Sequence, residues 1–148
     1  MKIIKKSNLI HNISIKHKDI GFVPTMGALH EGHISLIKKS KEKSKKTIVS
    51  IFVNPKQFNK KKDFATYPNN LRNDLSICKK LKVDYVFIPN AQEIYRWNDI
   101  KNLKPKIDNI MEEKFRKGHL NGVLAVMSKF LSIVKCSKIY MGKKDYQQ

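Results

Sequence analysis

The stretch GFVPTMGALHEGH, Gly21 through His33, decides the fold class, because it joins a short apolar run to a glycine-rich loop that carries two histidines. The run from Ile20 to Pro24 is β-branched and aromatic and has the length of a strand. Similar runs follow at Thr47–Val53, Asp84–Pro89 and Lys138–Met141. The sequence therefore predicts four strands.

Longer amphipathic segments separate these runs. Residues 34–46 place Ile34, Leu36 and Ile37 opposite a row of lysines, residues 71–82 have apolar side chains at helical spacing, and residues 122–134 are apolar enough for a mostly buried helix. Alternating strands and helices predict an α/β fold, with a parallel sheet covered on both faces. Residues 90–114 have mixed periodicity, which indicates an irregular connection with room for a short helix.

The chain has 148 residues, 41% of them hydrophobic, which suits one domain with a real core. It has neither an apolar run of membrane-spanning length nor a secretory signal, so we expect a cytoplasmic protein that does not bind membranes. Cys78 and Cys136 stand far apart without a CxxC motif. They are expected to be free thiols rather than a disulfide or metal ligands.

The formal net charge of +19 by itself favours a nucleic-acid-binding protein. However, only three of the 31 basic residues are arginine, the residue that reads bases and phosphates best. The lysines are spread along the chain together with many isoleucines and asparagines, all residues with A/T-rich codons. We therefore expect a solvated basic surface and no nucleic-acid partner.

Ligands of an open parallel sheet bind beyond the carboxyl ends of its strands, which directs attention to three loops. In the first, glycines allow close approach of the backbone, and a helix beginning near Glu31 to His33 would present free N–H groups to a phosphate. His30 and His33, at i and i+3, can face one side and stabilise phosphoryl charge. Two histidines at this spacing alone are more often ordinary surface residues, and no third metal ligand is evident.

The other two loops follow the second and the last predicted strands. FVNPKQF offers the amides of Asn54 and Gln57, which suit a small hydroxy acid better than a phosphate, although Asn-Pro is also a common turn. GKKDYQQ offers lysines for phosphate oxygens and Asp145 for a ribose hydroxyl, a metal or a lysine. Neither GxGxxG nor GxxxxGK[ST] occurs, which argues against the usual dinucleotide and P-loop sites.

These loops, in this order, closely resemble those of the pantothenate synthetase (pantoate β-alanine ligase) family of the HxGH nucleotidyltransferase superfamily. The motifs that carry the resemblance are PTMGALHEGH, FVNPKQF, DFATYPNNLRNDL and GHLNGVLAVMSKFLSIVKCSKIYMGKKDYQQ. The resemblance implies a Rossmann-like nucleotide-binding domain over residues 1–148, incomplete at its C-terminal end and without the family's small C-terminal domain. It also implies a homodimer.

The implied reaction is a two-step ligation in which pantoate attacks the α-phosphate of ATP, with Mg²⁺ assisting, and β-alanine then displaces AMP from the pantoyl adenylate. The resemblance assigns ATP contacts to two segments, with His33 as the proton donor and His30 near the phosphates. It assigns pantoate to Gln57 and Gln148, with β-alanine also at Gln57, and the metal to Asp74. The ATP-contacting residues are Met26, Gly27, Ala28, Leu29, His30, Glu31, Gly32, His33, Gly142, Lys143, Lys144 and Asp145.

The chain departs from the family in two respects. Lys143 stands where the family has Glu in GEKD, which affects that side chain's contact. The family is also about twice as long, with a further ATP-binding segment and a closing domain, so we expect a fragment, truncated product or decaying gene with little or no turnover.

Three alternatives remain open at the level of sequence. The first is another HxGH nucleotidyltransferase, although a phosphate-bearing substrate would require Arg or Lys in place of Asn54 and Gln57. The second is a basic, non-catalytic nucleic-acid-binding protein, whose affinity would fall steeply with salt. The third is an inactive remnant.

Overall fold

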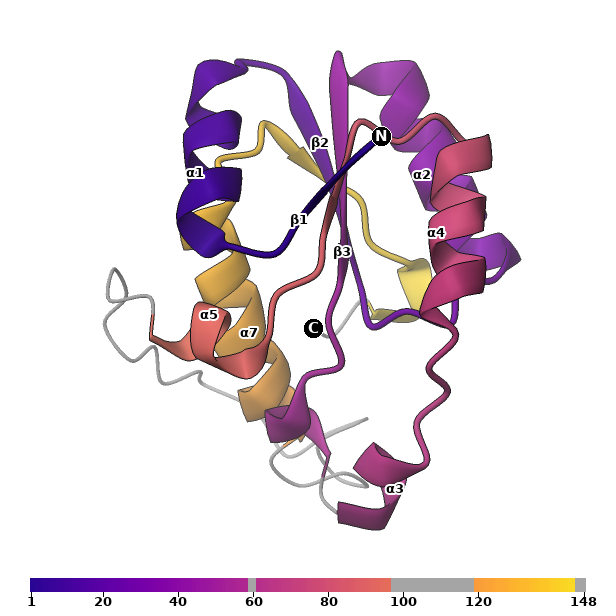
Figure 1. Ribbon diagram of the computed structural model, residues 1–148, viewed down its shortest axis with the longest axis vertical. Helices are drawn as coiled ribbons and strands as arrows, with labels where there is room; N and C mark the ends of the chain where they lie inside the picture. Colours follow the sequence, from indigo (N-terminus) through magenta and orange to yellow (C-terminus); the bar gives the residue numbers. More distant parts are fainter. Residues whose placement is uncertain (59–60, 97–118, 146–148) are drawn as a thin grey trace.

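The fold is a five-stranded parallel sheet with helices on both faces (Figure 1). The computed structural model describes residues 1–58, 61–96 and 119–145. The strands are β1 (Lys2–Ile4), β2 (Ile20–Thr25), β3 (Lys46–Ile51), β4 (Tyr85–Phe87) and β5 (Lys138–Ile139), in the order β1-β4-β3-β2-β5. All four neighbouring pairs are parallel, so each connection crosses over a face of the sheet.

The helices form one layer on each side of the sheet (Figure 1). One layer holds α1 (Ser7–Lys16), α5 (Ala91–Tyr95) and α7 (His119–Ile133), and the other holds α2 (Glu31–Lys43) and α4 (Leu71–Lys80). The short elements η1 (Pro55–Gln57), α3 (Lys61–Ala65) and η2 (Lys143–Asp145) follow strands β3 and β5 or lead into α4.

Successive residues of each central strand enter opposite cores, as the alternation of side chains in a strand requires. Phe22 of β2 and Ile48 of β3 pack beneath α1 and α7, and their neighbours Val23 and Val49 pack with Ile37 of α2 in the other layer. The central strands are therefore buried on both faces, which explains why they read as continuous apolar runs.

The predicted α/β class, the four strands and the three helices are confirmed, with ends shifted by a few residues. Strand β1 and helix α1 were not predicted. β1 is only three residues long, and of the three buried residues of α1 two are serines, Ser7 and Ser14. Helix α5 lies in the segment 90–114, whose remainder from residue 97 is outside the described residues.

Strand order reverses at β2, whose neighbours are β3 on one side and β5 on the other. In open parallel sheets ligands bind beyond the carboxyl ends of the strands at such a point. The chain leaves β2 at Thr25 and β5 at Ile139, so the first and last loops of the sequence prediction meet at this edge.

Both cysteines are free, as expected, and Cys78 is fully buried between α4 and the sheet. Burial, with the nearby charge of Asp74, raises the pKa of the Cys78 thiol to about 12, so it is a protonated core residue. Among the described residues, none of the helices is long and apolar enough to cross a bilayer.

Candidate functional site

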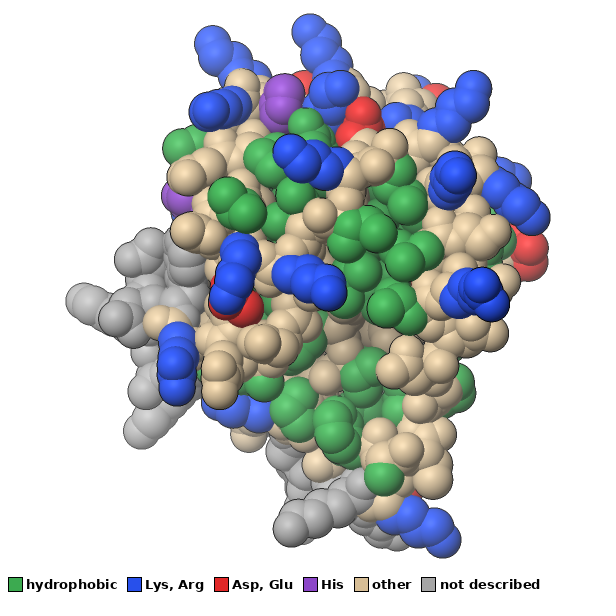
Figure 2. Space-filling model, in the orientation of Figure 1, with side chains coloured by type: hydrophobic (Ala, Val, Ile, Leu, Met, Phe, Trp, Pro, Cys, Tyr) green, Lys and Arg blue, Asp and Glu red, His purple; other side chains and the backbone are tan. Residues whose placement is uncertain are grey.

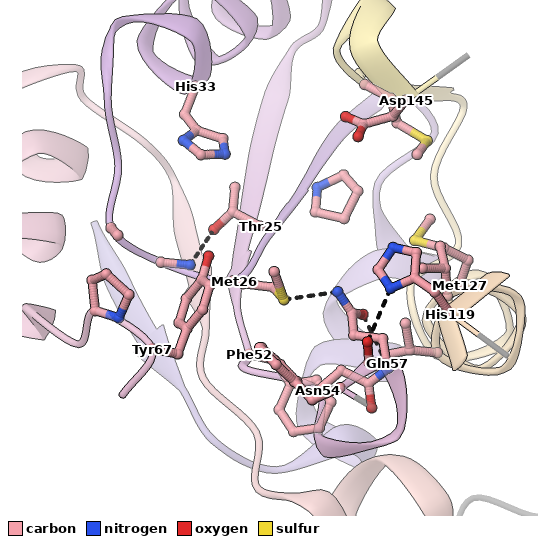
Figure 3. A pocket seen from close by; sticks show the side chains of 18 of the residues that line it. Thr25, Met26, His33, Phe52, Asn54, Gln57, Tyr67, His119, Met127 and Asp145 are labelled. Carbon is pink, nitrogen blue, oxygen red and sulfur yellow. Dashed lines mark hydrogen bonds between the residues drawn. The ribbon is translucent and has the colours of Figure 1, made fainter. Parts of the chain in front are cut away.

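A cavity of about 770 Å³ opens at the carboxyl edge of the sheet and is lined by all three predicted loops (Figure 3). The first loop contributes Met26 and the histidines, the second Gln57, and the last Asp145. The start of helix α7 closes the opposite wall. The loops that the sequence placed at one edge are therefore parts of one site.

The first loop leaves β2 through two residues in the left-handed region, Gly27 with φ 83° and Ala28 with φ 50°. This conformation turns consecutive N–H groups inward, onto the carboxylate of Asp74 in α4. The N–H of Ala28 donates to Asp74 Oδ2 at 3.0 Å and that of Leu29 to Oδ1 at 2.8 Å. A conformation unusual for alanine is thus held by two hydrogen bonds to a side chain that is 1% exposed.

His30 and His33 begin helix α2 as a reciprocal cap. His30 Nδ1 accepts from the N–H of Gly32 at 3.1 Å, and His33 Nδ1 accepts from the N–H of His30 at 3.4 Å. The two ring centroids are 4.1 Å apart. Because each Nδ1 accepts a backbone hydrogen, each neutral ring carries its proton on Nε2. The loop therefore offers two N–H donors together at a helix start, where an anion is favoured.

The remaining residues of the predicted ATP segment shape the loop from outside the cavity. Leu29 packs in the core beneath α2, while Glu31 and Gly32 form its first turn. None of the three is among the residues that line the cavity.

Asn54, the N-cap of η1, is 1% exposed and uses its whole hydrogen-bonding capacity within the protein. Oδ1 accepts from the N–H of Lys56 at 3.1 Å and from the hydroxyl of Tyr95 at 2.6 Å. Nδ2 donates to the carbonyl of Gly122 at 3.0 Å and to Oε1 of Gln57 at 3.1 Å. The N–H of Lys56 can only donate and the carbonyl of Gly122 can only accept, so these two partners determine which atom of the amide is the oxygen.

Asn54 in turn fixes the amide of Gln57. Because Oε1 of Gln57 accepts from Asn54, its NH₂ group points the other way, toward the cavity, where Nε2 is 2.9 Å from the sulfur of Met26 (Figure 3). A thioether is a weak acceptor, which an oxygen of a ligand could displace. Gln57 therefore presents a hydrogen-bond donor to the cavity.

Tyr95 and Lys56 support this amide pair from behind. The ammonium of Lys56 lies 3.9 Å from the centroid of the Tyr95 ring. Burial raises the pKa of Tyr95 to about 12, although its bond to Asn54 acts in the opposite direction. The Tyr95 hydroxyl therefore keeps its proton at neutral pH and donates it to Asn54.

The last loop reaches the cavity through Met141 and Asp145, whose N–H donates to the carbonyl of Gly142 at 2.9 Å. Gly142 and the exposed Lys143 do not line the cavity. The side chain of Lys144 and the whole of Gln148 lie outside the described residues. Of the predicted segment from Gly142 to Asp145, Asp145 is thus the described side chain that lines the cavity with the first two loops.

Helix α7 supplies a wall that the sequence reasoning did not assign. Phe52 of the segment after β3 joins its four apolar side chains Val123, Val126, Met127 and Phe130. His119, at the start of α7, is 6% exposed, and its Nδ1 lies 2.9 Å from the carbonyl oxygen of Gln57. His119 stands in the quoted motif GHLNG, but its contact spans 62 residues, and no local spacing predicts it.

Gly122 allows this wall to approach the second loop. A Cβ at this position would clash with the carbonyl oxygen of Lys56 and would lie 2.7 Å from Cα of Gln57. Backbone of α7 and backbone of η1 are therefore in direct contact, which only glycine permits.

Aromatic rings form the rim near α3. Phe58 stacks edge-on with Phe64 at 5.5 Å and with Tyr67 at 5.5 Å between ring centroids. Burial raises the pKa of the Tyr67 hydroxyl, and the charge of Asp74 adds to that effect. Tyr67 therefore faces the cavity as a neutral phenol.

No lysine or arginine is among the described residues that line the cavity, despite the net charge of +19. The lysines instead stand apart from one another over the visible face in Figure 2, without a continuous basic stripe. In the described part of the chain, no group of three or more His, Cys, Asp or Glu side chains could hold a metal ion. The side-chain donors on the described cavity wall are therefore uncharged or histidine groups, such as the amide of Gln57 and the phenol of Tyr67.

Comparison with known proteins identifies relatives along the whole chain. The family model described as pantoate-beta-alanine ligase matches residues 2–148. A curated pantothenate synthetase from Francisella tularensis subsp. novicida (strain U112) is 51% identical over 147 residues, which cover 98% of this chain and 56% of that protein. The chain therefore spans a little over half the length of the relative.

Solved structures agree with the sequence match. A pantoate-beta-alanine ligase from Francisella tularensis, complexed with beta-gamma ATP and beta-alanine, matches with a TM-score of 0.91 and 48% identity, over 100% of this chain and 59% of that chain. Pantothenate synthetase from Thermus thermophilus matches with a TM-score of 0.90 and 30% identity, over 99% of this chain and 54% of that chain. The sheet described above is the fold that these proteins share.

Proposed function

The chain belongs to the pantoate-beta-alanine ligase family, and from this premise we propose that it forms the ATP- and pantoate-binding domain of an enzyme that joins pantoate to β-alanine. In the first step a pantoate carboxylate oxygen attacks the α-phosphorus of ATP, and pyrophosphate leaves. In the second step the amine of β-alanine attacks the acyl carbon of pantoyl adenylate, and AMP leaves. The observation that carries the proposal is one cavity with two chemically different walls.

The loop from Met26 to His33 is the proposed phosphate wall. The Nε2–H groups of His30 and His33 and the N-terminus of α2 are donors for the phosphate oxygens, and they are already oriented by the cap. Donors fixed before the reaction stabilise the charge that develops on the transferring group. We assign His33 the role of proton donor because it occupies the matching position of the HxGH motif.

The wall made by η1 and α7 is the proposed pantoate wall. The NH₂ group of Gln57 suits a carboxylate or hydroxyl oxygen, and the apolar side chains of α7 suit the two methyl groups of pantoate. Asn54, which the sequence suggested as a direct ligand, acts on the substrate through Gln57 in this proposal, because its own bonds are all taken. Gln148 remains a prediction outside the described residues.

Mg²⁺ remains a proposal, and Asp74 does not fit the part of its ligand. Both carboxylate oxygens of Asp74 accept backbone hydrogens, and the residue does not line the cavity. Mg²⁺ usually binds through substrate phosphates and one or two carboxylates. Asp63 and Asp145 are the carboxylates on the described cavity wall. We instead assign Asp74 the role of holding the loop after β2, through the N–H groups of Ala28 and Leu29.

Two rivals are disfavoured by particular observations. A nucleotidyltransferase for a phosphate-bearing substrate would need arginine or lysine near Gln57, and the described lining includes neither. A nucleic-acid-binding protein would gather its lysines with aromatic rings, whereas the lysines on the face shown in Figure 2 stand apart from one another. The homodimer and the cytoplasmic location stay predictions.

The proposal is tested by calorimetric titration of the purified chain with ATP, with pantoate and with a short DNA duplex. We expect ATP and pantoate each to bind in the presence of the other, because they occupy different walls. DNA should bind only weakly and lose its affinity as salt rises. Tight, salt-sensitive DNA binding without binding of ATP or pantoate would overturn the proposal in favour of the nucleic-acid-binding rival.

A further inference from the structure

His119 is the third histidine on the cavity wall, and its ring is oriented by an acceptor rather than by a donor. Its Nδ1 lies 2.9 Å from the carbonyl oxygen of Gln57. A carbonyl can only accept, so Nδ1 carries the hydrogen of the neutral ring. Nε2 of His119 is consequently left with a lone pair.

This arrangement is the reverse of that in the first loop. In His30 and His33 the backbone donates to Nδ1, so that Nε2 is a donor suited to an anion. In His119 the backbone accepts from Nδ1, so that Nε2 is an acceptor suited to a hydroxyl group. The same side chain type thus provides opposite hydrogen-bonding groups on the two walls.

Nε2 of His119 has no hydrogen-bond partner among the residues that the structure describes, although the residue is only 6% exposed. Nε2 is not one of the fully buried atoms without a partner, so it is open to the cavity, where a hydroxyl group of a ligand can replace water as its donor. Figure 3 shows the His119 ring beside Gln57 and Met127 at the cavity wall. The unused acceptor and the Gln57 donor therefore belong to one subsite.

We propose that His119 is a substrate-binding residue whose Nε2 accepts a hydrogen bond from a hydroxyl group of the hydroxy acid, while the amide of Gln57 donates to another oxygen of the same molecule. The inference rests on the proposed function and adds a determinant of specificity to it. An acid of the same shape without hydroxyl groups would leave Nε2 of His119 without a partner, and would bind more weakly for that reason.

A matched pair of substitutions separates this role from the contact with Gln57. In His119→Asn the amide NH₂ replaces Nδ1–H and can still donate to the carbonyl of Gln57, but no acceptor remains at the position of Nε2. In His119→Gln the longer side chain brings its carbonyl oxygen near the position of Nε2, while the bond to Gln57 is lost. The first variant keeps the structural bond, and the second keeps the acceptor.

The test is calorimetric titration of the full chain and both variants with pantoate and with an analogue that lacks both hydroxyl groups, together with thermal unfolding. The unmodified chain should bind pantoate about tenfold more tightly than the analogue, as one buried hydrogen bond allows. His119→Asn should weaken pantoate about tenfold, leave the analogue and the unfolding temperature unchanged, and so abolish the preference. His119→Gln should retain part of the preference for pantoate over the analogue. This result tests the proposal if His119→Asn does not fold.

Two results would overturn the proposal. Unchanged pantoate affinity in a folded His119→Asn, or an equal loss for pantoate and the analogue, would reduce His119 to a packing residue and leave the proposed function intact. Failure of the unmodified chain to bind pantoate at all, with ATP still bound, would instead refute the proposed substrate and the role of His119 with it.

Discussion

Asn54 shows how one buried side chain can determine what its neighbour offers to a ligand. Its four hydrogen bonds are made to Lys56, Tyr95, Gly122 and Gln57, which come from three separate segments of the chain. Only one of its two amide orientations satisfies both backbone partners. The direction of the Gln57 amide, and with it the donor in the cavity, follows from that constraint.

We expect Asn54→Asp to reverse this arrangement. A carboxylate oxygen in place of Nδ2 would face the carbonyl of Gly122 and Oε1 of Gln57, so the free energy of unfolding should fall by about 1–3 kcal/mol. The Gln57 amide should turn over and pantoate should bind more weakly. Denaturant unfolding and pantoate titration measure both effects.

Asn12→Asp is the control for that substitution, because Asn12 is exposed on α1. It should change neither the stability nor the affinity for pantoate appreciably. Unaltered pantoate binding by a folded Asn54→Asp would contradict the assignment of Gln57 as the donor.

At the scale of elements, the loop after β2 depends on α4. The carboxylate of Asp74 holds the N–H groups of Ala28 and Leu29, next to the left-handed residues Gly27 and Ala28. Leu29 and Ala28 lie 45 and 46 residues before Asp74 in the sequence, so a tertiary contact fixes the loop rather than the loop's own sequence.

Asp74→Asn should loosen this loop, because one of the two backbone N–H groups would then face an amide NH₂. We expect a loss of about 1–3 kcal/mol in the free energy of unfolding and weaker ATP binding, with pantoate binding retained. Glu42→Gln, whose side chain is 56% exposed, is the matched surface control. If ATP affinity survived the loss of Asp74, the loop would not be the phosphate-binding element.

At the opposite edge of the sheet, where the strands begin, a charged cluster around Asp84 connects α2, β3 and the start of β4. Its carboxylate accepts from Lys41 of α2 at 2.8 Å, from Lys46 of β3 at 3.3 Å and from the N–H of Thr47 at 2.9 Å. Burial alone would raise the pKa of Asp84, but these three donors outweigh it and lower the pKa below its ordinary value. The charged form is therefore the one that stabilises the fold.

The sign of this pKa shift fixes the pH dependence of the contribution. A carboxyl whose pKa is lower in the folded state stabilises above its unfolded value of about 4 and loses that effect as the pH falls through the folded value. Asp84→Asn should therefore reduce the free energy of unfolding by about 1–2 kcal/mol at neutral pH and by much less near pH 3. Urea unfolding at both pH values tests this, and an equal loss at the two would contradict it.

The sequence predicted those features that depend on residues close together in the chain. The strands at Ile20 and Thr47 and the helix beginning at Glu31 follow from composition and spacing within a few residues. Strand β1 is too short for such a pattern, and two of the three buried residues of α1 are serines.

The site divides in the same way. His30 and Gln57 were identified from loop motifs, whereas His119 enters the site through a bond to a residue 62 positions earlier. Local spacing does not encode that contact. The bonds from Ala28 and Leu29 to Asp74, which argue against its assignment to a metal, likewise join residues far apart in the sequence.

At the scale of the whole molecule, the parallel sheet brings the ends of three strands to one edge and so assembles a site from loops distant in sequence. Relatives of the family are longer, and the chain covers 56% of one of them. The described cavity lining holds no lysine or arginine to neutralise phosphoryl charge.

For the 148-residue chain by itself we expect binding of substrates but little turnover. The described cavity lining holds no lysine or arginine, so few fixed donors stabilise the developing charge. An assay of ATP-dependent pantothenate formation, with a full-length family member as the positive control, measures this. Formation at a rate near that of the control would refute the expectation.

The most direct test of the two-walled site is calorimetric titration of ATP and of pantoate into the unmodified chain, His33→Ala and Gln57→Ala. We expect His33→Ala to weaken ATP about tenfold and to leave pantoate unchanged, because it removes a donor from the phosphate wall alone. Gln57→Ala should weaken pantoate by a similar factor and leave ATP unchanged. Equal losses of both ligands in both variants would contradict the assignment of separate walls to the two substrates.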